Sequence, residues 1–188
     1  MTKSTAQQIV DAALETLQEK GFAGASSRAI ARRGGFNQAL IFYHHGSLEG
    51  LLLAALERTS SERLARYREA LAGVTALDDL VSRMVDLYEE DRASGHMRVV
   101  AQLIAGTVDR PELSERVLAQ MEPWIEFAEE TLARVLPEEL PARELAYGAV
   151  TFYLGVNLMT HLDPDGARTD ALFARARELA PLLRGLTP

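Results

Sequence analysis

The chain has 188 residues, of which 47% are hydrophobic and 25% are charged, so it can bury a core and remain in solution. It has no cysteine, which excludes a disulfide framework and a thiolate metal site. Its net charge of −7 by itself argues against a nucleic-acid partner. The charge is unevenly divided, however: residues 1–50 carry a net +1 and residues 51–188 a net −8. This division fits a two-part molecule in which only the N-terminal part, here called the head, approaches phosphate, while the remaining part, the body, does not.

No run of about 18 apolar residues occurs, so we expect neither a membrane-spanning helix nor a membrane partner. The first residues, MTKSTAQQIVDAAL, lack the basic and then apolar plan of a secretory signal. We therefore expect a cytoplasmic protein.

Apolar residues recur three and four positions apart and never alternate with polar ones over a useful length, which predicts an all-α fold of about nine helices. Pro123 is expected to kink the helix that contains it. In chain order, the predicted helices cover residues 5–20, 27–33, 38–44, 48–72, 77–93, 97–108, 112–136, 143–161 and 169–184.

The second and third predicted helices form a distinct unit near the N-terminus. Ser26 or Ser27 can cap the first of them and Asn37 the second, and Gly35 between them can adopt a positive φ. Two short helices joined by a tight, glycine-containing turn have helix-turn-helix geometry. In that geometry the second helix lies in the major groove of DNA and presents its N-terminal side chains to base edges.

The stretch IVDAALETLQEKGFAGASSRAIARRGGFNQALIFYHHGSLEGLL, residues 9–52, resembles the TetR family of bacterial transcriptional regulators. Beyond this quarter of the chain, only the layout of six further helices and the phrase VDRPEL at 108–113 are similar to the family. The resemblance implies a helix-turn-helix DNA-binding domain over residues 1–47 and a helical ligand-binding and dimerisation domain over residues 48–188. It is carried by Ala12, Ala13, Gly21, Phe22, Ser27, Ile30, Ala31, Gly35, Phe42, Tyr43 and His44.

The resemblance also implies how the third helix meets DNA. Phe36 and Ile41 should pack inward, while Gln38 can pair with adenine and aliphatic neighbours can pack on a thymine methyl group. Tyr43 should meet phosphate or sugar, and the start of the second helix offers a phosphate seat. The expected DNA-contacting residues are Ser27, Arg28, Asn37, Gln38, Ala39, Leu40, Phe42, Tyr43 and His44.

Three positions depart from the family pattern. Many members have Tyr where this chain has Phe42, Phe where it has His45, and Lys where it has Leu48. Because two polar phosphate partners are missing, we expect weak non-specific binding and a shallow salt dependence. His45 is either neutral and satisfied by a backbone group or partly exposed. Neighbouring histidines on a helix point about 100° apart and make a poor ligand pair, so no metal or cofactor is expected.

The remaining helices carry no HExxH motif, no glycine-rich phosphate loop and no nucleophile elbow, so we expect no catalysis. The acidic runs at 89–91 and 129–130 are interpreted as solvated helix faces. The resemblance implies a cavity for a small-molecule effector, although aromatic and Met residues at helical spacing are more often plain core. The candidate lining residues are Met84, Leu87, Tyr88, Met97, Leu103, Trp124, Phe127, Phe152, Tyr153, Asn157 and His161.

The last two predicted helices are the expected dimer interface. Gly148 and Gly155 lie seven residues apart on one helix face, which allows close approach of a second copy. The other candidates are Leu158, Leu172, Phe173, Ala176, Leu179 and Leu183. A twofold homodimer would read a pseudo-palindromic double-stranded DNA operator, and the family's usual outcome is repression relieved by a ligand.

Two alternatives stay open from the sequence. The first alternative is a helical protein-interaction module whose head no longer binds DNA. It is compatible with the near-neutral charge of the head and with the apolar residues Phe42 and Leu48 at positions where many family members have polar ones. A helical enzyme or carrier that uses the cavity is the third reading, without a catalytic motif to support it.

Overall fold

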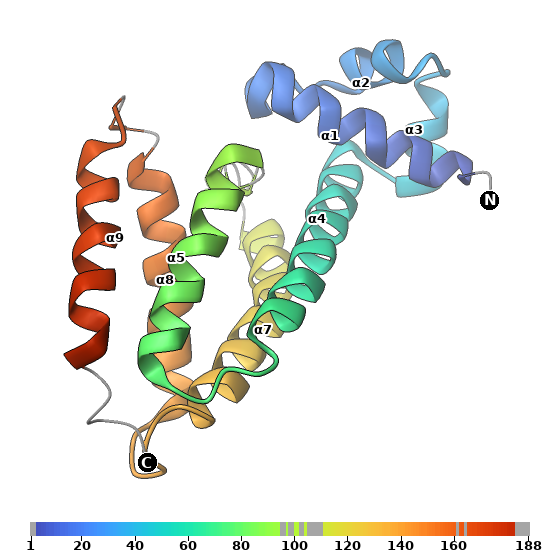
Figure 1. Ribbon diagram of the computed structural model, residues 1–188. Coiled ribbons are helices and arrows are strands. Elements are labelled where there is room, and N and C mark those ends of the chain that lie inside the picture. The colour runs from blue at the N-terminus through green and yellow to red at the C-terminus, as the bar shows by residue number, and fades with distance from the viewer. Residues whose placement is uncertain are drawn as a thin grey trace. The chain divides into compact units, whose positions relative to one another are not determined.

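The computed structural model describes residues 3–94, 97, 100–101, 104, 111–160, 162–163 and 165–182. In these residues the chain forms eight α-helices and no strand, which confirms the all-α prediction (Figure 1). The helices are α1 (Thr5–Gly24), α2 (Ser27–Gly34), α3 (Ala39–His45), α4 (Leu48–Leu71), α5 (Leu77–Ser94), α7 (Pro111–Ala133), α8 (Ala142–Thr160) and α9 (Ala167–Leu179). Most of the helix predicted over residues 97–108 lies outside the described residues.

The chain divides into two compact units. Unit 1 consists of Met1–Glu62 and Arg98–Gln120, and unit 2 consists of Arg63–Met97 and Met121–Pro188. Both α4 and α7 contribute residues to each unit. The boundary between these compact units therefore differs from the domain boundary expected after residue 47. That functional boundary stays a prediction. No single helix of the described chain is long and apolar enough to cross a membrane, and only the bent pair α3 and α4 meets that test jointly.

The helix α1 begins with a reciprocal cap and bends near its end. The Ser4 hydroxyl accepts from the Gln7 amide at 3.3 Å, and the Gln7 side chain accepts from the Ser4 amide at 2.9 Å. Gly21, which follows the helix predicted over residues 5–20, has a non-helical backbone with a φ of 69° and kinks α1, and a further turn continues to Gly24. Glycine tolerates this left-handed conformation because it has no Cβ.

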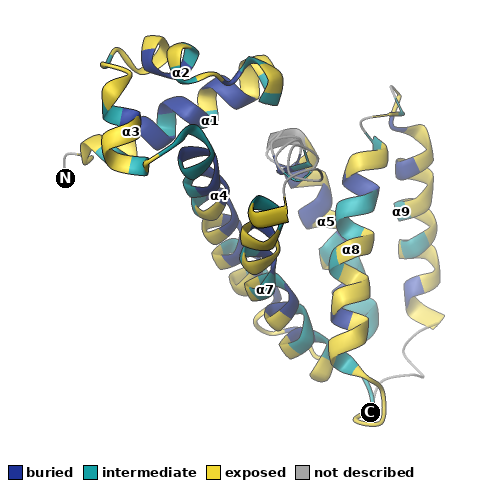
Figure 2. Cartoon of the chain, turned by 180° about the vertical axis from the view of Figure 1, so that it is seen from behind, coloured by how far each residue is buried: buried dark blue, intermediate teal, exposed yellow. Residues whose placement is uncertain are grey.

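Unit 1 has its own small core, formed where α1, α2, α3 and the start of α4 meet. The middle of α1, from Ile9 to Leu17, carries the buried residues of this helix (Figure 2). Leu14, Phe36, Leu40, Leu48 and Ala54 pack around this core and are partly buried. The buried members are Ile9, Val10, Ala12, Ala13, Ile30, Ala31, Ile41, Leu51 and Ala55.

Unit 2 packs the C-terminal parts of α4 and α7 with α5, α8 and α9. Its core cluster joins residues of α4, α5 and α7, and Tyr153 of α8 packs against it. The structure keeps α7 as one helix through Pro123. The buried members of the cluster are Leu64, Tyr67, Leu71, Val74, Leu80, Leu87, Phe127 and Val135.

Candidate nucleic-acid interface

Two adjacent glycines shape the turn between α2 and α3. Gly35 has a φ of 68°, and the amides of Gly35 and Phe36 both donate to the Ala31 carbonyl, which ends α2. Gly34 serves a different purpose, because a Cβ there would lie 2.1 Å from a ring carbon of Phe36 and 3.0 Å from the Cβ of Ala12. The turn therefore needs one glycine for its backbone angle and the other for close packing.

The caps of α2 and α3 are now defined. Ser26 caps α2, since its hydroxyl accepts from the Ala29 amide at 3.2 Å, and Ser27 becomes the first helical residue. The Asn37 side chain accepts from the Ala39 amide at 2.9 Å, but the N-cap position of α3 is Gln38, which makes no side-chain capping hydrogen bond, so Asn37 is not the cap itself. The helix α3 itself begins at Ala39, one residue later than the sequence predicted.

The two faces of α3 differ sharply in burial. Ile41 is fully buried and Phe36, just before the helix, is half-buried against the core, as expected. Tyr43 is 82% exposed, and its ring meets that of His44 at a near-perpendicular angle, with 4.9 Å between the ring centres. The other predicted contacts that are exposed are Arg28, Asn37, Gln38, Ala39, Phe42 and His44.

Two predicted DNA contacts are only half-exposed. Leu40 packs partly against the core of unit 1, so only part of its side chain is available to a base. Ser27 is half-buried, and its hydroxyl accepts a hydrogen bond of 2.7 Å from Nε2 of Gln38. The structure thus joins the proposed base-reading residue to the proposed phosphate seat.

The charges of the head are partly neutralised within unit 1. Arg33 pairs with Glu19 and lies 3.8 Å from Glu15, and Arg58 pairs with Asp11 at 2.5 Å. Within the described residues, Arg28 and Arg32 have no ion-pair partner. These two arginines are therefore the cations of α2 that remain available to an anionic partner.

His45 sits at the end of α3 with a half-buried ring. Burial lowers the pKa of His45 below its usual value, the nearby His44 acts in the same direction, and the main chain of Ala6 opposes both. The ring is therefore neutral near pH 7. In the part of the chain that the structure describes, its Nε2 has no hydrogen-bond partner.

Gly50, which the sequence analysis did not single out, fixes the junction of α3 and α4. Gly46 ends α3, and the Ser47 hydroxyl caps α4 by accepting from the Gly50 amide at 3.0 Å. A Cβ on Gly50 would lie 2.2 Å from the carbonyl oxygen of His45. Because that oxygen belongs to the backbone, it cannot move aside without shifting α3.

Gly50→Ala is expected to lower the free energy of unfolding by about 1–3 kcal/mol, because it overpacks this junction. It should also weaken any binding that depends on the placement of α3. Urea unfolding followed by circular dichroism measures the first effect. Gly73→Ala is the matched control, since a Cβ there meets no atom within 4 Å. Equal stability of the two variants would contradict the packing role of Gly50.

The structure brings some of the predicted effector-binding residues together. The core cluster of unit 2 includes Phe127, and partly buried Met84, Trp124 and Tyr153 pack against it. The ring of Tyr88 meets that of Tyr153 edge-on, with 6.2 Å between the ring centres. Leu87, Met97 and Asn157 are buried, and the Asn157 amide donates to the Tyr153 carbonyl. Phe152 is not among them, because its side chain is 58% exposed. Leu103 and His161 lie outside the described residues.

One expectation about the body is wrong. Glu89 and Glu90 are exposed, but Asp91 is completely buried, with 0% exposure. It accepts hydrogen bonds from arginines of α4 and from two tyrosine hydroxyls. One feature of the sequence could have predicted this burial: Asp91 continues the three- and four-residue spacing of Leu80, Met84 and Leu87 along the inward face of α5.

The predicted dimer residues divide into two groups. Leu158, Leu172 and Leu179 are exposed, and an added Cβ at Gly148 or Gly155 would meet nothing within 4 Å. Phe173 instead faces its own chain, since its ring lies 4.3 Å from that of Tyr88. Ala176 is half-buried, and Leu183 lies outside the described residues. Exposed residues predominate along α8 and α9 (Figure 2).

No group of three or more His, Asp or Glu side chains that could hold a metal ion was found in a search of the described residues. Exposed aromatic, amide and guanidinium groups lie on α2 and α3 and at the turn between them.

Comparison with known proteins identifies the family. The model of the family "Bacterial regulatory proteins, tetR family" matches residues 9–55. The regulator UidR of Escherichia coli K12 is 30% identical over 110 residues, which are 58% of this chain and 55% of UidR, so the match spans little more than half of that relative. The regulator BetI of Stenotrophomonas maltophilia is 30% identical over 147 residues, 74% of each chain.

The fold agrees over a longer stretch than the sequence. The fatty acid degradation regulator FadR from Bacillus halodurans superposes with a TM-score of 0.77 over 96% of both chains at 17% identity. At that identity the similarity concerns the fold alone, and the curated relatives supply the assignment. The chain therefore belongs to the tetR family of bacterial regulatory proteins, a family of helix-turn-helix transcriptional regulators rather than of enzymes.

Proposed function

We propose that this chain is a homodimeric repressor that reads a pseudo-palindromic operator with α3 and leaves it when a small-molecule effector binds. The observation that carries the proposal is the division of α3 into two faces. On one face, Ile41 is buried in the core of unit 1. On the other face, Tyr43 and His44 are exposed, and so is Gln38 directly before the helix. A short, anchored helix with exposed amide and aromatic groups suits the major groove.

Gln38 is the proposed base reader. An amide that offers one acceptor and two donors can pair with adenine in the major groove. The hydrogen bond from Nε2 to Ser27 uses one of its two N–H groups, so the other N–H and Oε1 remain for a base. The Ser27 contact then holds the side chain in place before DNA binds, which reduces the entropy lost on binding.

Gln38→Ala is expected to weaken operator binding by about 1–3 kcal/mol, a factor of about 5–150, and to leave non-specific binding unchanged. Fluorescence anisotropy with the DNA upstream of the chain's own gene and with a scrambled duplex, each at two salt concentrations, measures both quantities. Gln18→Ala, on the exposed part of α1, is the control. Equal and feeble binding of the unaltered chain to both duplexes would favour a protein-interaction module instead.

The second copy is proposed to cover one face of α8. Leu145, Phe152, Met159 and Leu162 are exposed, and with Gly148 and Gly155 they follow a spacing of three and four residues. This is the spacing of a helix seam that packs against another helix. An exposed apolar seam beside two glycines that leave room for close approach fits a self-complementary twofold interface.

Phe152→Glu is expected to convert the dimer to monomer and to abolish tight operator binding, because two linked heads bind far more tightly than one. Size-exclusion chromatography with light scattering measures the mass. Tyr147→Glu is the matched control, since Tyr147 is equally exposed on α8 but lies off the seam. A monomeric unaltered chain, or a dimer that tolerates Phe152→Glu, would remove α8 from the interface.

Effector release follows from linkage between the two sites. A ligand lowers operator affinity only by as much as it prefers the conformation that does not fit the operator. The aromatic residues that meet in unit 2, Trp124, Phe127 and Tyr153, are the proposed ligand-binding region. A ligand that binds this region without changing operator affinity would contradict the proposed switch.

A further inference from the structure

Five side chains of unit 2 form a buried polar network around Asp91: Arg63, Arg66, Tyr67, Asp91 and Tyr153. Asp91 accepts from both Nε and Nη2 of Arg63, the former at 3.2 Å, and from Nη2 of Arg66. It also accepts from the hydroxyls of Tyr67 and Tyr153, each at 2.7 Å. A carboxylate has about four lone-pair positions, so these five donors saturate it.

The network holds more positive than negative charge. Its two guanidinium groups face one carboxylate, and over the described residues neither Arg63 nor Arg66 has another acidic partner. Arginine keeps its proton at any physiological pH, so the surplus cannot be removed by titration. Since Arg63 is buried against Asp91, the surplus lies on Arg66, which is partly exposed, and an anion from outside the chain would balance it.

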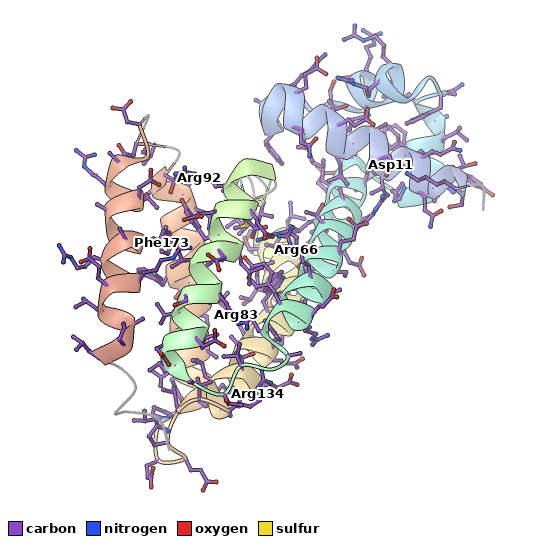
Figure 3. All side chains as sticks on the ribbon, viewed as in Figure 1. Asp11, Arg66, Arg83, Arg92, Arg134 and Phe173 are labelled. Carbon is purple, nitrogen blue, oxygen red and sulfur yellow. The ribbon has the colours of Figure 1, made fainter. Side chains whose placement is uncertain are left out.

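Arg66 is the member that an outside anion can reach. Its side chain is 38% exposed, whereas that of Arg63 is 7% exposed. Arg66, labelled in Figure 3, reaches from α4 to Asp91 on α5 through Nη2, and among the described residues its buried Nε has no hydrogen-bond partner. A guanidinium edge with unused N–H groups is the usual binding partner of a carboxylate, which it holds through two parallel hydrogen bonds.

Aromatic rings border the same network. The guanidinium carbon of Arg63 lies 5.3 Å from the ring centre of Trp124, and that of Arg66 lies 6.0 Å from the ring centre of Tyr67. Trp124 is half-buried and meets Tyr67 edge-on at 5.2 Å. An apolar or aromatic ligand body could therefore pack beside the charged group that Arg66 holds.

The two tyrosines add a contact that the network satisfies incompletely. The hydroxyl oxygens of Tyr67 and Tyr153 lie 2.7 Å apart, and each also lies 2.7 Å from the same oxygen of Asp91. Three oxygen–oxygen contacts of this length need three protons, but two hydroxyls supply only two.

We propose that the effector of this regulator is a small organic carboxylate with an apolar body, bound through Arg66 with Trp124 beside it. The regulatory consequence rests on the proposed function, whereas the binding itself does not. The carboxylate contacts the exposed part of the Arg66 guanidinium and balances the second guanidinium charge. Its arrival redistributes the hydrogen bonds that tie α4 to α5 and α8 through Asp91.

Direct binding of matched probes to the full chain tests the proposal. The probes are benzoate, 4-phenylbutyrate and octanoate, each compared with its neutral amide at constant ionic strength by calorimetry and thermal shift. At least one carboxylate should bind tenfold or more tightly than its amide. If no carboxylate of the three binds better than its amide, the proposal is overturned.

A variant pair locates the binding. Arg66→Gln should weaken binding of the preferred carboxylate at least tenfold and leave the amide unchanged, while Arg83→Gln, an exposed arginine on α5, should change neither. Circular dichroism verifies that both variants fold. Carboxylate binding that survives Arg66→Gln also overturns the proposal. Operator binding by ligand-free protein, measured in parallel, shows separately whether the proposed regulator function holds.

Discussion

Asp91→Ala is expected to lower the free energy of unfolding by about 3–5 kcal/mol, the range observed when one partner of a buried ion pair is removed. The variant leaves the guanidinium of Arg63 buried without its acid and takes the shared acceptor from Tyr67 and Tyr153. The loss therefore exceeds that of a single hydrogen bond. Urea unfolding followed by circular dichroism and by the fluorescence of Trp124 measures it.

The matched control is Asp86→Ala on the same helix. Asp86 also pairs with an arginine, Arg177, but both side chains are exposed to solvent. Exposed ion pairs contribute about 0–1 kcal/mol, so this variant should unfold almost as the unaltered chain does. A loss below about 1 kcal/mol for Asp91→Ala would mean that the network contributes no more than a surface pair.

The contribution of Asp91 should also depend on pH in a defined direction. Burial alone would raise the pKa of Asp91, but hydrogen bonds and charge from Arg63 and the tyrosine hydroxyls outweigh it and lower the pKa below the usual 3.8. The folded chain then binds this proton less readily than the unfolded chain does. The stabilisation is therefore fully present above that usual value and is lost as the pH falls through the lower folded pKa.

Ile41→Ala is expected to lower the free energy of unfolding by about 2–5 kcal/mol, because it opens a cavity in a fully buried site of a small core. Tyr43→Ala, two residues away on the same helix, should change stability by no more than about 0.5 kcal/mol, since its side chain is 82% exposed. Both variants should lose operator affinity, but for different reasons. Ile41 positions α3, and Tyr43 is proposed to contact the DNA backbone.

Denaturant unfolding and anisotropy on the same preparations separate the two roles. If Tyr43→Ala destabilised the chain as strongly as Ile41→Ala, Tyr43 would be part of the packing rather than of the interface. If Tyr43→Ala bound the operator normally, the exposed face of α3 would not be the surface that meets DNA.

The head was well predicted because its signals are local. The positive φ of Gly35 follows from the tight turn between two short helices, whereas the inward direction of Ile41 was implied by the family resemblance. Gly50 was missed because its reason is a carbonyl of the preceding helix, and no spacing rule identifies such an approach. The cap of α2 needed the structure to choose between Ser26 and Ser27.

The body was less predictable because its contacts join distant segments. Asp91 appears in the sequence as the end of an acidic run, and its burial depends on Arg63 and Tyr153, which lie 28 and 62 residues away. Phe152 and Phe173 show the same difficulty, since periodicity shows which residues share a face but not what that face meets. Phe152 was expected in the cavity and is exposed, whereas Phe173 was expected at the dimer interface and stacks on Tyr88.

A footprint of the full chain on the DNA upstream of its own gene, combined with sedimentation of the complex, tests the central claim most directly. The account predicts two chains on each duplex and two protected half-sites related by a dyad, with centres about 10 base pairs or a multiple of that apart. Protection of a single half-site by one chain, or sequence-independent protection along the duplex, would contradict a twofold regulator that reads its operator through α3.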